Sequence, residues 1–275
     1  MTNITENKTI KIYSFYYKET EIPVSNELYI PVMAGNNLRP LNDNFTGDDT
    51  GESISEKNNY YSELTGLYWV WKNTRQEIVG SCHYRRYFTA KKSPLKYRIE
   101  NFLLFATWFY KKRKGIIYTR KINRFRDYIL TETEITEIMQ TCDVILPQKR
   151  EFKYSIKEHF RKYHDLNDLK IVEDIIKSVF PEYIDAFHKT MNGNFLYSNN
   201  MFIMGNEEFN RLMNWLFAIL FEFESRINIQ NYAGYQQRVF GFMSERLITV
   251  WINHQNLRIK ELPVIYFKKL KYTQS

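Results

Sequence analysis

The chain alternates short apolar segments, rich in Ile, Val, Tyr and Phe, with longer segments whose apolar residues recur at helical spacing. The short segments predict buried strands, and they lie at residues 9–17, 27–34, 77–82, 143–147, 201–204 and 258–266. The longer segments predict helices, which lie at residues 53–73, 131–141, 155–190, 206–226 and 240–254, with a break at Pro181. Strands that alternate with helices favour an α/β sheet flanked by helices. The 275 residues suit one such domain with an elaboration.

The first predicted helix follows a segment rich in Gly, Asn and Asp at residues 35–52, which predicts a loop. Ser53 and Glu56 have the spacing of a capping box. We therefore expect one continuous helix that begins at Ser53 or Ser55 and ends near Asn73.

Positive charge is concentrated in one part of the chain. The net charge is +8, and residues 91–126 hold twelve Lys or Arg residues and one acid, Glu100, so this segment carries +11 and the rest carries −3. That asymmetry disfavours a uniformly basic nucleic-acid-binding protein and indicates an anionic surface as partner. Within the predicted insertion at residues 91–130, an aromatic and apolar run at 102–110 meets four basic residues at 111–114. Segregation of this kind predicts binding to an anionic membrane surface. A nucleic-acid-binding surface and an ordinary helix with a solvated basic end are the alternatives.

The two cysteines, Cys82 and Cys142, form no CxxC pair and no metal-ligand cluster. Free thiols are typical of a reducing cytoplasm. The first nine residues are polar, so we expect no signal peptide. No run reaches the roughly 18–20 apolar residues that a spanning helix needs. We therefore expect a cytoplasmic protein, peripheral on the inner face of the plasma membrane.

The most informative local pattern is Cys-His-Tyr-Arg-Arg-Tyr-Phe at residues 82–88, directly after a predicted strand. Ligands of open α/β sheets sit beyond the carboxyl ends of the strands. His83, Arg85 and Arg86 can bind phosphate oxygens there through charge-assisted hydrogen bonds. Successive residues of an extended segment point to opposite faces, so we expect only one of the two arginines to face the ligand. The alternative is a solvated basic turn.

Lys57 and Asn58 lie in the first turn of the predicted helix, where backbone amides suit anions. Core packing of this helix with exposed lysines is the alternative. Asn199 and Asn200 enter a predicted strand and can hydrogen-bond sugar hydroxyls as donors and acceptors, although Asn is also common in tight turns before strands.

The predicted helix at residues 240–254 and its entry carry Glu245, a candidate general base, and Arg238, a candidate phosphate ligand. A surface Glu–Arg pair is the alternative. The sequence holds no Gly-rich phosphate loop, zinc-ligand pattern or GxSxG elbow. It also has no Asp-x-Asp at a strand end, and its acidic pair, Asp48–Asp49, lies in the predicted loop.

Taken together, these motifs resemble those of a bacterial family known as a domain of unknown function and common in capsule and O-antigen gene clusters. Its signature reads KN…ELT…YWxWKN…HYRRYF, and here it falls at residues 57–58, 63–65, 68–73 and 83–88. Later segments at residues 200–204, 215–220 and 241–247 also fit, so the resemblance covers roughly residues 10–265. The insertion at 91–126 does not match.

The resemblance implies a GT-A-like fold, with a Rossmann-like mixed sheet flanked by helices, to which this sequence adds the basic helical insertion. It implies a glycosyltransferase that moves a hexose, galactose or galactofuranose, from a UDP-sugar to a lipid-linked oligosaccharide during capsule, O-antigen or other cell-surface polysaccharide synthesis. A non-catalytic glycan- or lipid-binding protein of such a cluster is the alternative, nucleic acid is not expected as a partner, and the oligomeric state is open.

The resemblance also assigns roles to residues. Tyr16 or Tyr17 would stack on the uracil beside Lys57 and Asn58, and Asn199, Asn200 and Glu63 would contact hydroxyls of the sugar or acceptor. Glu245 would deprotonate the acceptor in an inverting displacement. The residues His83–Tyr84–Arg85 stand where the fold usually carries a metal-binding Asp-x-Asp. Since arginine can neutralise a leaving diphosphate directly, we predict a metal-independent reaction with no cofactor.

Overall fold

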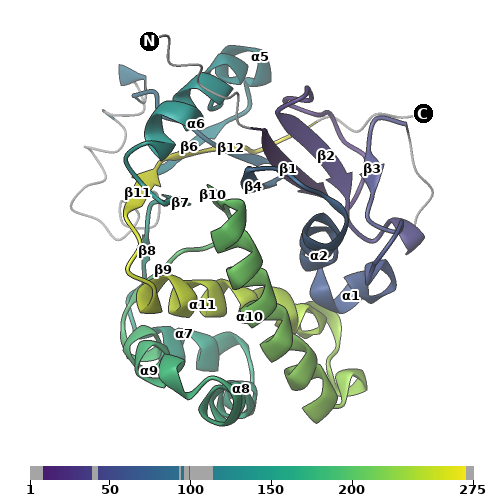
Figure 1. Cartoon of the computed structure of the whole chain (residues 1–275), viewed down its shortest axis with the longest axis vertical. Helices are drawn as coiled ribbons and strands as arrows, with labels where there is room; N and C mark the ends of the chain where they lie inside the picture. The colour runs from purple at the N-terminus through teal and green to yellow at the C-terminus, as the bar shows by residue number, and fades with distance from the viewer. Residues whose placement is uncertain (1–8, 39–42, 93, 96–98, 100–113, 271–275) are drawn as a thin grey trace, which may run out of the picture.

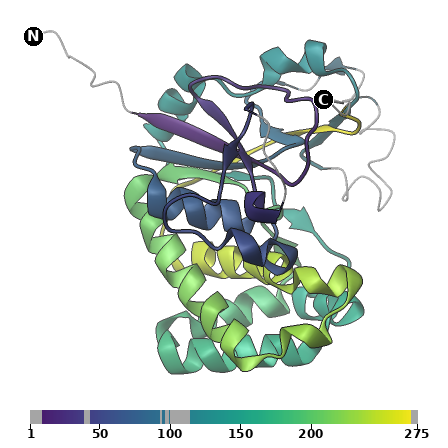
Figure 2. The same cartoon turned by 90° about the vertical axis from the view of Figure 1, so that its right-hand side faces the viewer.

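The computed structural model describes the chain except for residues 1–8, 39–42, 93, 96–98, 100–113 and 271–275. The described residues form a large mixed sheet with helices on both faces and a helical layer beneath one face (Figures 1 and 2). The predicted α/β architecture, a mixed and mostly parallel sheet flanked by helices, is therefore confirmed.

The described part of the main sheet has the strand order β11-β7-β10-β4-β1-β2-β3. These strands are β1 (Ile10–Tyr16), β2 (Tyr29–Met33), β3 (Thr46–Gly47), β4 (Ile78–His83), β7 (Val144–Pro147), β10 (Phe202–Gly205) and β11 (Ile259–Leu262). Strand β1 is parallel to both β2 and β4, whereas β10 runs antiparallel between β4 and β7. The sheet continues off this path through β5 (Arg86–Phe88), β6 (Ile116–Thr119) and β12 (Val264–Phe267).

Alternation along the strands divides the core into two layers. Tyr13 and Phe15 of β1 face one layer and Ile12 faces the other. The first layer holds α2 (Leu64–Asn73), α10 (Asn206–Arg226), α11 (Val239–His254) and the outer helices α7 (Ile156–Tyr163), α8 (Leu166–Val179) and α9 (Ile184–Asn192). The second layer holds α5 (Ile122–Phe125) and α6 (Glu132–Met139). A separate two-stranded sheet pairs β8 (Arg150–Glu151) with β9 (Phe195–Leu196), which are far apart in the sequence.

The helix predicted at residues 53–73 is interrupted. It consists of a short 3-10 turn, η2 (Ser55–Lys57), then α1 (Asn58–Tyr61) and α2, with Ser62 between them at a φ of 53°. The predicted capping box is wrong, because the Ser53 hydroxyl donates to the Asp48 carbonyl and accepts from the Ser55 amide rather than from the Glu56 amide. The buried Asp48 carboxylate orders this region by accepting hydrogen bonds from the amides of residues 35 and 36 and from the Ser55 hydroxyl.

The last predicted strand, at 258–266, is two strands, β11 and β12, which pair with different partners. In the predicted insertion, β6 pairs with β12 and Phe125 is buried in the second core layer, so this part belongs to the fold. The aromatic and basic run at 102–113 lies outside the described residues, and its membrane role stays a prediction. Within the described part of the chain, no helix combines the length and apolar character needed to cross a bilayer.

Candidate active site

A cavity of about 680 Å³ opens where the parallel strands β1 and β4 end. Its walls come from segments far apart in sequence: the ends of β1 and β4, the α1–α2 junction, the two-stranded β8–β9 sheet, α7, and α11 with the short turn η6 (Gly234–Arg238) before it. The carboxyl ends of parallel strands are the usual ligand position in open α/β sheets. The cavity is therefore the candidate active site.

The segment predicted to hold a diphosphate forms a tight turn at one wall. Strand β4 ends at His83, Tyr84 and Arg85 make the turn, and Arg86 begins β5 by pairing with His83. Both arginines line the cavity, so the expectation that only one would face the ligand is wrong. The reason is the turn, which removes the strict alternation of an extended strand. The Tyr266 ring lies 5.2 Å from the Arg85 guanidinium carbon and 5.0 Å from that of Arg86.

The wall is strongly electropositive. Arg85 and Arg86 form no ion pair with a carboxylate of the described residues, and burial lowers the pKa of Arg86. The pKa of His83 is far below its ordinary value because of burial and the positive charges of Arg86, Arg238 and Arg85, so its ring is neutral. The His83 Nδ1 and Arg85 Nε atoms are buried without a hydrogen-bond partner. Unpaired buried polar groups cost free energy.

Five arginines and two glutamates line the cavity. The arginines are Arg85, Arg86, Arg150, Arg238 and Arg246, and the glutamates are Glu63 and Glu245. The excess of positive charge, together with neutral histidines, suits a ligand with more than one negative charge.

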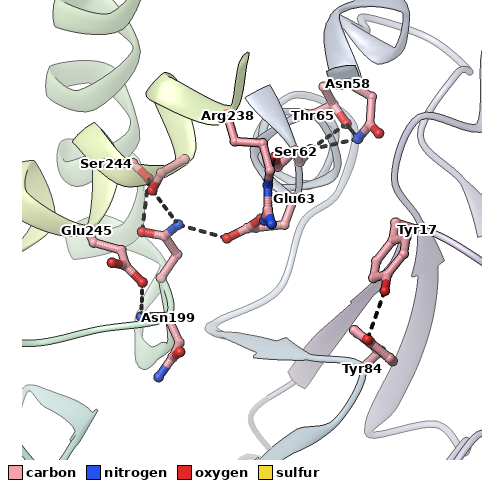
Figure 3. Close-up of polar contacts among 12 residues, drawn as sticks. Tyr17, Asn58, Ser62, Glu63, Thr65, Tyr84, Asn199, Arg238, Ser244 and Glu245 are labelled. Carbon is pink, nitrogen blue, oxygen red and sulfur yellow. Dashed lines mark hydrogen bonds and ion pairs between the residues drawn. The ribbon is translucent and has the colours of Figure 1, made fainter. Parts of the chain in front are cut away.

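Glu63, at the start of α2, is held by a buried network (Figure 3). The Asn200 amide donates to Glu63 Oε1 at 3.0 Å and accepts from the Ser244 hydroxyl at 3.0 Å. Arg238 approaches Glu63 Oε2 at 3.7 Å and donates to the Ser62 hydroxyl at 3.0 Å. The side chain of Asn200 therefore positions Glu63, and Glu63 rather than Asn200 lines the cavity.

Glu245 lies on α11 at the cavity wall, and the backbone amide of Asn199 donates to its Oε1 at 2.6 Å. Burial raises its pKa, while Arg246, 3.9 Å away, and the Asn199 amide act in the opposite direction. Glu245 is therefore not the surface partner of Arg238 that the alternative interpretation required. A partly buried carboxylate with a raised pKa is suited to proton transfer.

Asn199 and Asn200 both have positive φ, 75° and 50°, so they form the tight turn that leads into β10. Asn tolerates this backbone region better than most residues. Of the pair, only Asn199 lines the cavity. The turn interpretation is therefore confirmed, and the turn brings the Asn199 side chain to the cavity, where its contact with a sugar hydroxyl stays a prediction.

The four residues predicted to bind the nucleotide are placed differently. Tyr17, which is 43% exposed, lines the cavity and its phenol bonds that of Tyr84 at 3.1 Å (Figure 3). Tyr16 also borders the cavity but is 1% exposed, with its hydroxyl against that of Tyr87. Asn58 borders the cavity and donates to the Ser62 carbonyl and the Thr65 hydroxyl.

Lys57 is not brought to the cavity with the others. Its ammonium pairs with Glu224 of α10 at 2.9 Å. The alternative interpretation, an exposed lysine on a packed helix, describes its position better, because the short turn η2 directs this side chain toward α10.

Sequence reasoning missed one wall of the cavity. Arg150, His159, Tyr163 and His164 come from β8, α7 and the residue after it, and Arg246 comes from α11. Arg246 is 3% exposed, and its guanidinium donates to the Phe242 carbonyl at 2.6 Å. The amphipathic pattern of α7 shows which face is apolar, but it does not show that the edge of this face borders a cavity.

Among the described residues, no group of three His, Cys, Asp or Glu side chains is arranged to hold a metal ion. Of the two glutamates that line the cavity, Glu63 contacts Asn200 and Arg238, and Glu245 accepts a hydrogen bond from the backbone amide of residue 199.

Comparisons with known proteins give the chain a family. The sequence model of the family described as "Domain of unknown function (DUF4422)" matches residues 11–256. No curated protein sequence matches the chain significantly. Among solved structures, the apo structure of WbbM, a bifunctional glycosyltransferase, is similar with a TM-score of 0.83 and 27% sequence identity. That match covers 97% of this chain and 47% of the other, so the chain spans about half the length of that protein. Since the family model covers most of the sequence, the chain belongs to the DUF4422 family.

Proposed function

We propose that the protein is a glycosyltransferase of the GT-A type that transfers a hexose, galactose or galactofuranose, from a UDP-sugar to a lipid-linked glycan acceptor. The similarity to one half of a bifunctional glycosyltransferase supports the reaction class. The cavity supports the donor class, because its arginine-rich wall at the ends of β1 and β4 suits a diphosphate.

The observation that carries the proposal is the pair of cavity-lining arginines, Arg85 and Arg86, that lack a carboxylate partner among the described residues. Unpaired guanidinium groups that line a cavity are costly unless a ligand compensates them. In the donor complex they would hold the diphosphate, and Tyr17 beside them would stack on the uracil.

Transfer requires a base and charge stabilisation of the leaving group. Glu245 would take the proton of the acceptor hydroxyl, whose oxygen then forms a bond to the anomeric carbon as the bond from that carbon to the diphosphate oxygen breaks. Attack opposite the leaving group inverts the anomeric centre. Arg85 and Arg86 would stabilise the departing UDP without a divalent cation. The basic segment at residues 91–126 would bring the protein to the cytoplasmic face of the membrane, where a lipid-linked acceptor for a surface polysaccharide is available.

The first test measures UDP release from a panel of UDP-sugars in the absence of acceptor. A transferase slowly hydrolyses its cognate donor, whereas a chain that binds UDP-sugars and hydrolyses none is a binding protein instead. Activity that is lost in EDTA and restored by manganese would contradict the metal-independent part of the proposal.

The second test measures UDP affinity by calorimetry. Each charge-assisted hydrogen bond contributes about 1.5–3 kcal/mol, so Arg86→Ala should weaken binding roughly 10- to 150-fold. Arg75→Ala is the matched control, because Arg75 is exposed and lies outside the cavity. Equal UDP affinity in the two variants would contradict the proposal that Arg86 binds the diphosphate.

A further inference from the structure

The rim of the active-site cavity carries two strongly exposed tyrosines. Tyr235 of η6 is 61% exposed and Tyr163 of α7 is 55% exposed, although both line the cavity. Tyr235 packs on Phe242 with ring centroids 4.7 Å apart, and the His164 ring lies 4.5 Å from Phe242. These three rings contact one another and form an aromatic wall of the cavity. Exposed aromatic rings that line a cavity present a flat apolar face on which a ligand can pack.

A second cavity of about 580 Å³ adjoins the first at this wall. Tyr163 and His164 line both cavities. Gln236 fixes the partition between them, because His164 Nδ1 lies 2.8 Å from its amide oxygen while its amide nitrogen donates to the Tyr163 carbonyl. The two cavities are therefore neighbours that share Tyr163 and His164.

The second cavity has the polar chemistry of a site for a neutral ligand. Three asparagines, Asn167, Asn228 and Asn231, line it with Gln236 and can both donate and accept hydrogen bonds. The basic residues there are largely compensated: Arg161 pairs with Glu158 at 2.8 Å and Arg226 pairs with Glu222 at 2.7 Å. This differs from the first cavity, where Arg85 and Arg86 have no such partners.

A sugar matches the combination of exposed aromatic rings at the rim and uncharged polar side chains in the second cavity. A pyranose presents apolar C–H faces, which pack on aromatic rings, and a rim of hydroxyl groups, which bond to amides and carboxylates. The two cavities together give room for more than the donor, since a single small-molecule site usually occupies about 300–1,000 Å³.

We propose that Tyr163 and Tyr235 form an acceptor subsite, and that the protein recognises an acceptor of at least two sugar residues. The terminal sugar lies in the first cavity with its reacting hydroxyl toward Glu245, and the next sugar packs on the Tyr163–Tyr235 rim and extends toward the second cavity. The statement that the terminal sugar reacts rests on the proposed glycosyltransferase function. The statement that the two tyrosines bind an oligosaccharide does not depend on that function.

The test is saturation-transfer NMR on the full chain in saturating UDP, with a panel of neutral methyl disaccharides built from galactose, glucose and mannose and the matching methyl monosaccharides. We expect at least one disaccharide to bind with saturation on the ring protons of both sugars and to bind at least tenfold more tightly than either monosaccharide. Tyr163→Ala and Tyr235→Ala should each weaken that binding at least tenfold.

Tyr154→Ala is the matched control, since Tyr154 is a 42% exposed tyrosine that lines neither cavity. UDP affinity, measured on the same samples, reports whether each variant is folded and whether the donor end is intact. Disaccharide binding that survives both rim substitutions, equal binding of mono- and disaccharides, or no sugar binding by the UDP-loaded protein would overturn the subsite. Failure of the wild-type chain to bind UDP would instead contradict the proposed function.

Discussion

The buried amide of Asn200 offers a sharp test of how the site is held together. Asn200→Asp keeps the shape of the side chain but replaces the amide that donates to Glu63 Oε1 at 3.0 Å with a second carboxylate. The hydrogen bond to Glu63 is charge-assisted and contributes about 1.5–3 kcal/mol, and its loss leaves a partly buried carboxylate oxygen next to a like charge. We expect a loss of about 3 kcal/mol in the free energy of unfolding, which corresponds to a fall of roughly 6–12 °C in Tm.

The loss should depend on pH with a defined sign. Two carboxylates this close cannot both ionise at low cost, so one of them has its pKa raised in the folded protein of the variant. A raised folded-state pKa stabilises at low pH and destabilises as pH rises through it. The difference in Tm between variant and wild type should therefore be small at about pH 5 and large at about pH 8.

Asn199→Asp is the matched control for this experiment. Asn199 also has a left-handed backbone, with a φ of 75°, but its side-chain amide bonds only the neighbouring Ser198 hydroxyl at 3.1 Å among the described residues. Its backbone amide, which donates to Glu245, is the same in the variant. Calorimetric unfolding of both variants across pH separates a backbone effect from the effect on Glu63. Equal destabilisation by the two substitutions, or a loss in Asn200→Asp that does not change with pH, would refute the reasoning.

Three further predictions use the same structure. Glu245→Gln should lower the rate of transfer by roughly 10²- to 10⁴-fold without lowering Tm, because burial raises the pKa of Glu245 and the neutral side chain avoids the cost of a desolvated charge. The kcat/KM of the wild type should fall as the pH drops through this raised pKa. A variant whose kcat/KM shows the same fall would exclude Glu245 as the base. Gly35→Ala should cost about 1–3 kcal/mol, since Gly35 has a φ of 75° and a Cβ there would approach the Asn58 side chain at 2.4 Å; an unchanged Tm in thermal unfolding would contradict this. Lys57→Met breaks a partly exposed ion pair with Glu224 and should change the free energy of unfolding by at most about 1 kcal/mol. It should leave UDP affinity unchanged, and a weaker affinity in titration calorimetry would show that Lys57 contacts the donor.

The secondary structure could be predicted well where the pattern is long and periodic. The helix predicted at 206–226 is α10, and that predicted at 240–254 differs from α11 by one residue. The prediction failed at residues 53–73 because the break depends on one residue, Ser62, whose positive φ is supported by contacts from Arg238 far along the chain. No local pattern reports such a contact.

The candidate site was predicted in part, and the parts differ for a physical reason. The order of the residues in the sequence determined the sheet's strands and hence that residues 83–86 lie at a strand end, where a ligand is expected. It could not show that residues 84 and 85 form a turn that presents both arginines, or that Asn200 serves Glu63 while Asn199 reaches the cavity. The wall made by α7, η6 and α11 exists only because the chain packs these helices beneath the sheet. Periodicity specifies which face of a helix is apolar, whereas its neighbours across the fold decide which residues border an empty space.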